Sequence, residues 1–187
     1  MPNSEKTPST RLTTMYDSLL KVDGAARLQK WMEMSEPTGH SWEDNDWMSH
    51  CMPHIKLHSW STEDPKHARV VFSYEVPRHN SNQSGNMHGG CTATLFDFAT
   101  SMPLCLVSKP GFWFYMGVSR TLNVTYARAI PVGEKIFIEC EIMSIGQTLC
   151  TVRGVMRRQS DGVVLATCEH GKFNTDPPVQ SQRSSKM

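Results

Sequence analysis

A polar loop that runs into a pair of glycines is the segment of this sequence best suited to chemistry. Residues 82–90 read Asn-Gln-Ser-Gly-Asn-Met-His-Gly-Gly, and a helical pattern of apolar residues covers 88–107. Glycines at a helix start let a ligand or a second backbone approach closely. The first N–H groups of a helix have no partner within it, so they can hold a carbonyl oxygen or an anion. The sequence therefore predicts a donor site at His88-Gly89-Gly90.

Asp97 lies nine residues after His88 and is the only acidic or basic side chain between His88 and Ser108. Burying an acid in a largely apolar helix is costly unless the acid is paired or used in chemistry. Plainer interpretations exist: the glycines form a simple turn, Asp97 makes a core hydrogen bond, and His88 is a satisfied polar residue. A donor array and an acid together favour a catalytic site.

The spacing of apolar side chains predicts the elements that position these residues. One helical pattern covers about 13–36, weakened by Gly24, and another covers 88–107, with a bend or end expected at Pro103. Strand patterns cover 55–60, 69–76, 112–126, 134–144, 148–158 and 163–174. Short turns between the last four predict an antiparallel meander. A helix that is apolar nearly all round requires a sheet curved around it, so we expect an α+β fold.

Composition excludes several classes of protein. The 187 residues are 39% hydrophobic and 20% charged, which suits one domain with a core. The net charge of +1 argues against a nucleic-acid binder. Without an uncharged apolar run of about 20 residues we expect no membrane span. The six cysteines form no Cys-x-x-Cys pair, and the start shows no signal-peptide pattern, so we expect reduced thiols in an intracellular protein.

Asn82, Gly85, the His88-Gly89-Gly90 segment and Asp97 together resemble the hot-dog fold thioesterases of the phenylacetate-degradation and mammalian acyl-CoA thioesterase type. Further matches are Gly117-Val118-Ser119, 122–126, 131–134, Gly146-Gln147-Thr148, Asp161-Gly162 and His170-Gly171-Lys172. The resemblance implies a long central helix wrapped by a curved antiparallel sheet. We divide the chain into an N-terminal extension (1–67: helix, loop and first strand), a thioesterase domain (68–176) and a tail (177–187).

The resemblance also implies a mechanism of thioester hydrolysis. The Gly89 N–H, placed by His88, would hold the oxyanion, and Asp97 would act as general base on water or as nucleophile. Ser119 would help to position the water, and Asn82 would orient the water or the thioester. In the family the acid and the donors come from opposite subunits of a dimer, or of a dimer of dimers. The spacing agrees, because nine residues of helix separate the two groups by about 13 Å.

The leaving thiol would be coenzyme A or the phosphopantetheine arm of an acyl carrier, such as that of a polyketide synthase, and no other cofactor is implied. Family positions near that arm match Tyr126, Arg128, Gly146, Gln147, Thr148 and Lys172. For Arg128 and Lys172, a solvated strand end is the plain alternative. Few of these residues are charged, which favours a carrier-protein thioester over CoA. Two alternatives remain open: a hot-dog hydratase or dehydratase that pairs His88 with Asp97, and a non-catalytic acyl-thioester binding subunit.

Three segments depart from the family pattern. Residues 112–116, rich in aromatic side chains, either line an acyl pocket or form a packed strand or interface. The extension carries Trp31, Trp42, Trp47 and Trp60, to which the resemblance assigns no role. The terminal Ser185-Lys186-Met187 resembles a peroxisomal address, so the expected location is cytoplasmic or peroxisomal, in fatty-acyl or secondary metabolism.

A metal site is a weaker interpretation of another cluster. His50, Cys51, His54 and His58 approach the spacing of metal ligands on a helix. Pro53 interrupts such a helix, and the sequence offers no second ligand cluster. We therefore expect no metal.

Overall fold

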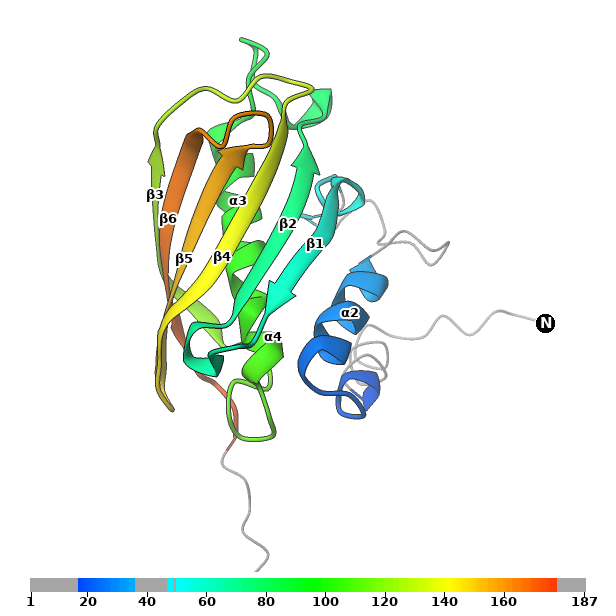
Figure 1. Cartoon of the computed structure of the whole chain (residues 1–187), viewed down its shortest axis with the longest axis vertical. Helices are drawn as coiled ribbons and strands as arrows, with labels where there is room; N and C mark the ends of the chain where they lie inside the picture. The colour runs from blue at the N-terminus through cyan, green and yellow to red at the C-terminus, as the bar shows by residue number, and fades with distance from the viewer. Residues whose placement is uncertain (1–16, 36–46, 49, 178–187) are drawn as a thin grey trace, which may run out of the picture.

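The computed structural model describes residues 17–35, 47–48 and 50–177, which build one antiparallel sheet wrapped around a central helix (Figure 1). The strand order is β1-β2-β4-β5-β6-β3. The strands are β1 (Ile55–Ser61), β2 (Arg69–Glu75), β3 (Val118–Tyr126), β4 (Lys135–Ile145), β5 (Leu149–Arg158) and β6 (Val164–Phe173). The predicted α+β fold with a curved antiparallel sheet is confirmed.

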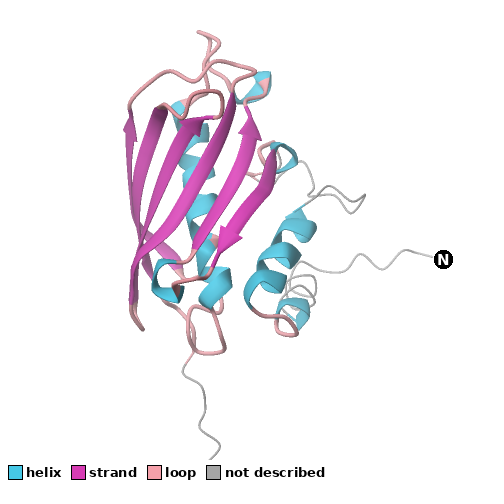
Figure 2. Ribbon diagram, in the orientation of Figure 1, coloured by secondary structure: helices cyan, strands magenta, loops and turns pink. Residues whose placement is uncertain are grey.

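The central helix is α3 (Gly89–Ser101), and α4 (Pro103–Val107) continues it after a break at Met102. The break falls where Pro103 predicts it, because proline cannot donate a helical hydrogen bond. By length and composition the stretch Gly89–Val107 would suffice to cross a membrane, yet most of it is buried inside the protein. Figure 2 shows the helix lying along the inner face of the sheet, as expected for a core helix.

A close contact sets the distance between α3 and the sheet. Phe96 of α3 is fully buried against Gly154 of β5, where an added Cβ would lie 2.7 Å from the Phe96 ring and 2.9 Å from Cys168 Sγ. Only glycine allows this approach without a shift of the helix. Leu95 and Ala99 are buried with Phe96, so this face of α3 is part of the core.

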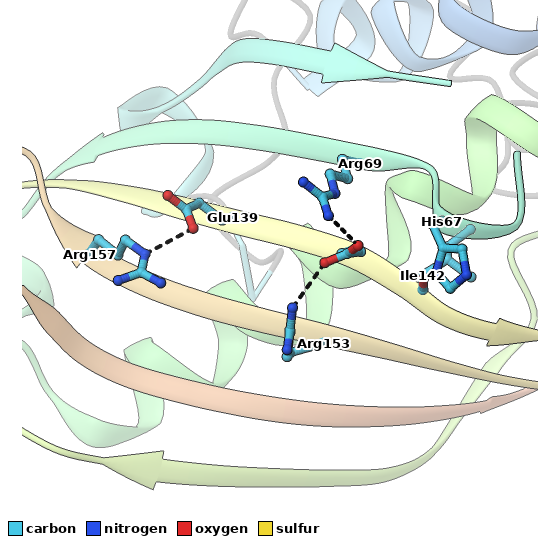
Figure 3. Close-up of polar contacts among 7 residues, drawn as sticks. His67, Arg69, Glu139, Ile142, Arg153 and Arg157 are labelled. Carbon is cyan, nitrogen blue, oxygen red and sulfur yellow. Dashed lines mark hydrogen bonds and ion pairs between the residues drawn. The ribbon is translucent and has the colours of Figure 1, made fainter. Parts of the chain in front are cut away.

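The opposite face of the sheet carries ion pairs (Figure 3). Glu141 of β4 lies between Arg69 of β2 and Arg153 of β5, with N–O distances of 2.6 and 3.0 Å. Glu139 pairs with Arg157 at 3.0 Å. Exposed pairs of this kind contribute little to stability. Their charges alternate in sign across the strands, so this face is a solvated surface without a basic patch.

The segment between α4 and β3 differs from its predicted strand. β3 begins at Val118, and Trp113 and Met116 have positive φ angles of 57° and 58°, which a strand does not allow. Trp113 is fully buried, and its Nε1 donates a hydrogen bond to the Gly146 carbonyl at 2.7 Å. Trp113 is therefore packed, in line with the packed alternative, and a role of the 112–116 segment in an acyl pocket stays a prediction.

The N-terminal extension is fixed to the domain through Arg27 of α2 (Gly24–Ser35). The guanidinium donates to the carbonyl of Val22 and to the Ser108 hydroxyl, and it lies 4.4 Å from the centre of the Phe114 ring. α2 begins at Gly24, whose φ of +48° favours glycine, so the single helix predicted over 13–36 is interrupted.

The boundary at residue 67 stays a prediction, and the structure shows how the strand before it is paired. β1 pairs with β2 in the antiparallel register Ile55–Tyr74, so the strand assigned to the extension is an edge of the main sheet. Three short 3₁₀ turns complete this region: η1 (Met52–His54), η2 (Pro65–His67) and η3 (Arg78–Asn80). Trp42 and the terminal Ser185-Lys186-Met187 lie outside the described residues.

Candidate active site

The start of α3 presents a free backbone donor. His88 is the N-cap, and its Nδ1 accepts the Gly90 N–H at 3.0 Å. This bond satisfies the Gly90 N–H. The Gly89 N–H, also in the first turn, has no hydrogen-bond partner in the described part of the chain. A Cβ on Gly90 would lie 3.0 Å from His88 Nδ1, so the cap and the glycine require each other. The geometry matches the donor site expected from the sequence.

The loop before α3 is held by Asn82. Its Oδ1 accepts the N–H groups of Ser84 and Asn86 at 2.9 and 3.2 Å. The Tyr126 hydroxyl, from the end of β3, donates to the Gly89 carbonyl at 2.9 Å. In this single chain both side chains therefore position the donor loop, whatever contact they make with a substrate.

Asp97 lies in the middle of α3, on the side that faces β3. Its Oδ1 accepts a hydrogen bond of 2.6 Å from the Ser119 hydroxyl, the residue predicted to work with it. A β-bulge between Ser119 and Thr121 interrupts the register of β3 with β6 at this point. Bulges change the direction of side chains. The Asp97 side chain is 52% exposed, so its expected burial does not occur in one chain.

His170 of β6 is a candidate functional residue that was expected only as part of the matching segment His170-Gly171-Lys172. Its side chain is fully buried, and Nε2 lies 3.4 Å from Asp97 Oδ1. Nδ1 lies 2.6 Å from the Thr100 hydroxyl oxygen, whereas Nε2 has no hydrogen-bond partner within the described ranges. Desolvation lowers the pKa of His170 to about 4, the nearby Lys172 charge adds to this effect, and the ring is neutral at pH 7.

A buried nitrogen without a hydrogen-bond partner beside a carboxylate is uncommon, which makes His170 a candidate for the site. The alternation of β6 was the signal that could have revealed His170. Ala166, Cys168, His170 and Lys172 occupy every second position, and all four are buried. A histidine and a lysine on the inner face of a strand must meet polar partners on the helix that the strand packs against.

Lys172 is not a solvated strand end, and it does not lie at the surface where a thiol arm would contact it. Its side chain is buried, and Nζ donates to the Ser101 hydroxyl at 2.8 Å. Ser101 in turn donates to the Asp97 carbonyl at 2.8 Å. Desolvation lowers the pKa of Lys172, and the charge of Asp97 opposes that shift. The lysine therefore belongs to the support of Asp97.

The other residues expected near the thiol arm form two groups at opposite ends of the sheet. Tyr126 pairs with Ala166 at one end of β6, and Arg128 donates to the Val164 carbonyl beside them. Gly146, Gln147 and Thr148 form the β4–β5 turn at the other end, where Gln147 donates to the Gly111 carbonyl. Seven residues of strand separate the two ends by about 23 Å. One chain does not bring these residues together.

A cavity of about 440 Å³ opens beside Asp97. Its walls are mainly apolar, and Thr94, Ser101 and Asp97 are its polar residues. Met116 is the one residue of the 112–116 segment that lines it. Pockets of this size suit small organic ligands held by apolar walls and a few polar groups.

Two groups on α3 have the chemistry that hydrolysis requires. Asp97 with Ser119 can remove a proton from water, and the Gly89 N–H can hold a developing oxyanion. Eight residues of helix separate Gly89 from Asp97 by about 12 Å, too far for one carbonyl group. The dehydratase alternative requires His88 to pair with Asp97. The same separation prevents that pairing within one chain.

The histidine-rich segment around residue 54 offers no metal cluster. Among residues 17–35, 47–48 and 50–177, the structure contains no group of three potential His, Cys, Asp or Glu ligands. His50 and His54 both lie near His79. Their ring centroids are 5.5 and 5.2 Å, respectively, from the centroid of the His79 ring.

Comparison with known proteins places this geometry in a family. Residues 84–165 match the family model of the thioesterase superfamily. Acyl-coenzyme A thioesterase 13 of Mus musculus is 30% identical over 104 residues, which cover 56% of this chain and 71% of the relative. The Homo sapiens protein of that name matches over the same length with the same identity.

Solved structures show the same fold. Thioesterase superfamily member 2 from Mus musculus superimposes with a TM-score of 0.62 at 25% identity, covering 79% of this chain and 95% of the other. A hypothetical thioesterase from Streptococcus pneumoniae, solved with coenzyme A, has a TM-score of 0.57 at 21% identity. The match covers 66% of this chain and 88% of the other. A Streptococcus mutans protein bound to acetyl CoA has a TM-score of 0.57 at 19% identity. The match covers 74% of this chain and 98% of the other. The chain therefore belongs to the thioesterase superfamily, and it is a thioester hydrolase with the hot-dog fold.

Proposed function

We propose that this protein hydrolyses an acyl-CoA thioester to a carboxylic acid and free coenzyme A, with Asp97 activating the water. The observation that carries the proposal is the 2.6 Å bond from Ser119 to Asp97 Oδ1 beside a 440 Å³ apolar cavity. Relatives named acyl-coenzyme A thioesterase support it, as do structural neighbours solved with coenzyme A or acetyl CoA. The few exposed charges near the expected thiol arm keep a carrier-protein thioester as the alternative substrate.

In the proposed reaction, Asp97 takes a proton from water while the water oxygen attacks the thioester carbonyl carbon. The carbonyl oxygen becomes an oxyanion, which accepts a hydrogen bond from the Gly89 N–H. The C–S bond then breaks, and the thiolate leaves and takes the proton from Asp97. Ser119 holds the carboxylate through its hydrogen bond to Oδ1. Asp97 as a nucleophile that forms a mixed anhydride is the alternative route.

A complete site requires two chains in this proposal. β3 is an edge strand of nine residues, and Val118 and Tyr126 at its ends are 52% and 54% exposed. Long, exposed edges favour pairing with another strand. Two-fold pairing of β3 with its copy would bring the Gly146–Thr148 turn of one chain toward Tyr126 and Arg128 of the other. It would also bring Asp97 of one subunit toward the Gly89 donor of its partner.

A thiol-release assay over a panel of acyl-CoA esters tests the activity. We expect Asp97→Asn to lower kcat by about 10²-fold or more, because the amide cannot accept the proton. Asp161→Asn, in the exposed β5–β6 turn, is the matched control and should keep the wild-type rate. Full activity of Asp97→Asn would show that this carboxylate is not the base, whereas no thiol release by wild type from any ester would favour the binding-subunit alternative. Release from acylated carrier protein but not from any CoA ester would favour the carrier substrate.

Mixing two inactive variants tests the shared site. Gly89→Pro removes the proposed donor N–H, and proline is tolerated at the first position of a helix. The extended backbone of His88, with φ −65° and ψ 137°, also suits a following proline. If each site uses both subunits, random pairing with Asp97→Asn should restore about a quarter of the wild-type activity. Absence of recovery in a demonstrated mixed dimer would place both groups in one chain.

A further inference from the structure

The cavity beside Asp97 is built from two parts of the chain with different origins. One wall is the exposed side of α3, which lies within the residues that match the thioesterase superfamily, 84–165. The facing wall is formed by Trp31, Trp47 and Met48, which lie outside that match. The superfamily therefore accounts for the catalytic wall, and the extension of this chain supplies the other.

Trp47 is attached directly to the catalytic helix. Its indole Nε1 donates a hydrogen bond of 2.9 Å to the Thr94 hydroxyl. Thr94 lies three residues before Asp97, so the two side chains share a face of α3. The indole is 80% exposed, because the bond holds it over the helix instead of burying it in the core. It is placed to cover an apolar group that enters the cavity.

Trp31 is held by the packing of its helix. In α2, Leu28 is fully buried, and Arg27 is buried against Ser108 and the Phe114 ring. These contacts fix α2 against the domain at a point one turn before Trp31. The position of Trp31 therefore follows from the packing of α2.

The chemistry of the lining defines what fits. The apolar part of the lining includes two tryptophans, Met48 and Phe98. Among the described residues that line the cavity there is no arginine, lysine or histidine, so these residues offer no cation to a carboxylate at the far end of an acyl group. Aromatic and methionine side chains favour alkyl and aryl groups of varied shape.

We propose that Trp31, Trp47 and Met48 determine acyl specificity by forming the wall that binds a large, uncharged acyl group next to Asp97. This inference rests on the proposed function and adds to it the class of acyl group. Dodecanoyl or phenylacetyl esters should be preferred over acetyl esters. Esters of dicarboxylic acids, such as succinyl-CoA, should react poorly.

The test compares kcat/KM for acetyl-CoA and dodecanoyl-CoA in Trp47→Ala and in a matched control, Trp60→Ala. Trp60 is also partly exposed, at 42%, but it lies on β1 and does not line the cavity. Trp47→Ala should lower kcat/KM for dodecanoyl-CoA about tenfold, in the range that apolar pocket contacts provide, and change acetyl-CoA less than twofold. Trp60→Ala should leave the ratio of the two substrates unchanged. Trp47→Phe should recover part of the preference.

An unchanged substrate ratio in Trp47→Ala and Trp31→Ala, with wild-type circular dichroism, would overturn the inference. An equal loss on both substrates would also overturn it, because it would indicate a role in positioning Asp97. Failure of the proposed function is distinct, since wild type would then release no thiol from any ester. In that case, calorimetry of a dodecyl thioether of CoA tests whether Trp47 binds the acyl group. The inference requires about tenfold weaker binding of this compound to Trp47→Ala than to wild type. Equal binding to the two proteins overturns it.

Discussion

The start and the middle of α3 carry the two halves of the site, and they are built in different ways. At the start, His88 caps Gly90, two residues away, and the free N–H belongs to Gly89 between them. In the middle, Asp97 meets Ser119 of β3 and His170 of β6, which are 22 and 73 residues away in the sequence. The donor half is local, whereas the acid half depends on the packing of three elements.

The two regions also differ in how far their polar groups are exposed to solvent. The cap at the start is exposed, and its hydrogen bond competes with water. In the middle, His170 and Lys172 are buried, and desolvation lowers the pKa of both side chains. Buried polar groups are costly unless they are paired. Perturbation of the middle should therefore have larger consequences than perturbation of the start.

Paired glycine substitutions test this difference most strongly. In Gly154→Ala, the new methyl would lie 2.7 Å from the Phe96 ring, so overpacking should lower the free energy of unfolding by about 2 to 3 kcal/mol. Gly90→Ala at the helix start displaces only the His88 ring, and it should cost about 1 kcal/mol. Urea denaturation measures both. Gly146→Ala, where the nearest atom is 3.6 Å away, is the control. Equal losses at positions 154 and 90 would contradict the comparison.

The pH dependence of stability should report the buried histidine. The pKa of His170 is about 4 in the folded protein, below the ordinary value of 6.5, so the unfolded chain binds more protons between these values. Stability should therefore fall as the pH drops from about 6.5 toward 4. From pH 7 to pH 5 the loss attributable to His170 should be about 2 kcal/mol at most.

The measurement compares the wild type with His170→Asn, an amide that can still face Thr100. The difference between their pH profiles isolates His170 from the other histidines. Asp97 and Lys172 also act on this ring, with opposite signs, so the variant keeps both. Parallel profiles between pH 7 and pH 5 would show that His170 is not held neutral by burial.

The contact between Asp97 and Ser119 should matter less than the carboxylate itself. Ser119→Ala removes the 2.6 Å hydrogen bond and leaves Asp97 as a base, so kcat should fall about tenfold, equivalent to about 1.4 kcal/mol. Ser160→Ala, in the exposed β5–β6 turn, is the control. If Ser119→Ala instead removed activity as completely as Asp97→Asn, the serine would have a direct role in the reaction.

The smallest effect on stability is expected for the cap. His88→Ala should lower the free energy of unfolding by about 1 kcal/mol, the usual cost of losing an N-cap. His88→Asn should restore most of it, because asparagine is a favourable N-cap residue. Thermal denaturation of the two variants checks this pair. Equal destabilisation would show that His88 acts through a contact other than its bond to Gly90.

The contrast between the two halves explains which predictions succeeded. The helix start at Gly89, the break at Pro103 and the positions of all strands except the start of β3 were predictable, because caps, proline and apolar periodicity act over a few residues. The role of Trp113 was not predictable, because an aromatic segment looks alike in a pocket and in a core. Lys172 was expected near the thiol arm of the substrate, with a solvated strand end as the alternative, whereas the alternation of β6 directs it inward.

The sequence by itself determined most of the elements, and it pointed to Gly89 as the candidate donor and to Asp97 as the candidate acid. Only the tertiary structure decided which side chains meet that acid. Ser119 reaches it beside a β-bulge, and His170 and Lys172 lie beneath it through the register of β6 with β3 and β5. The same packing places Trp31 and Trp47 across the cavity from Asp97. Strand register and helix packing depend on contacts between distant residues, so no short stretch of sequence encodes them.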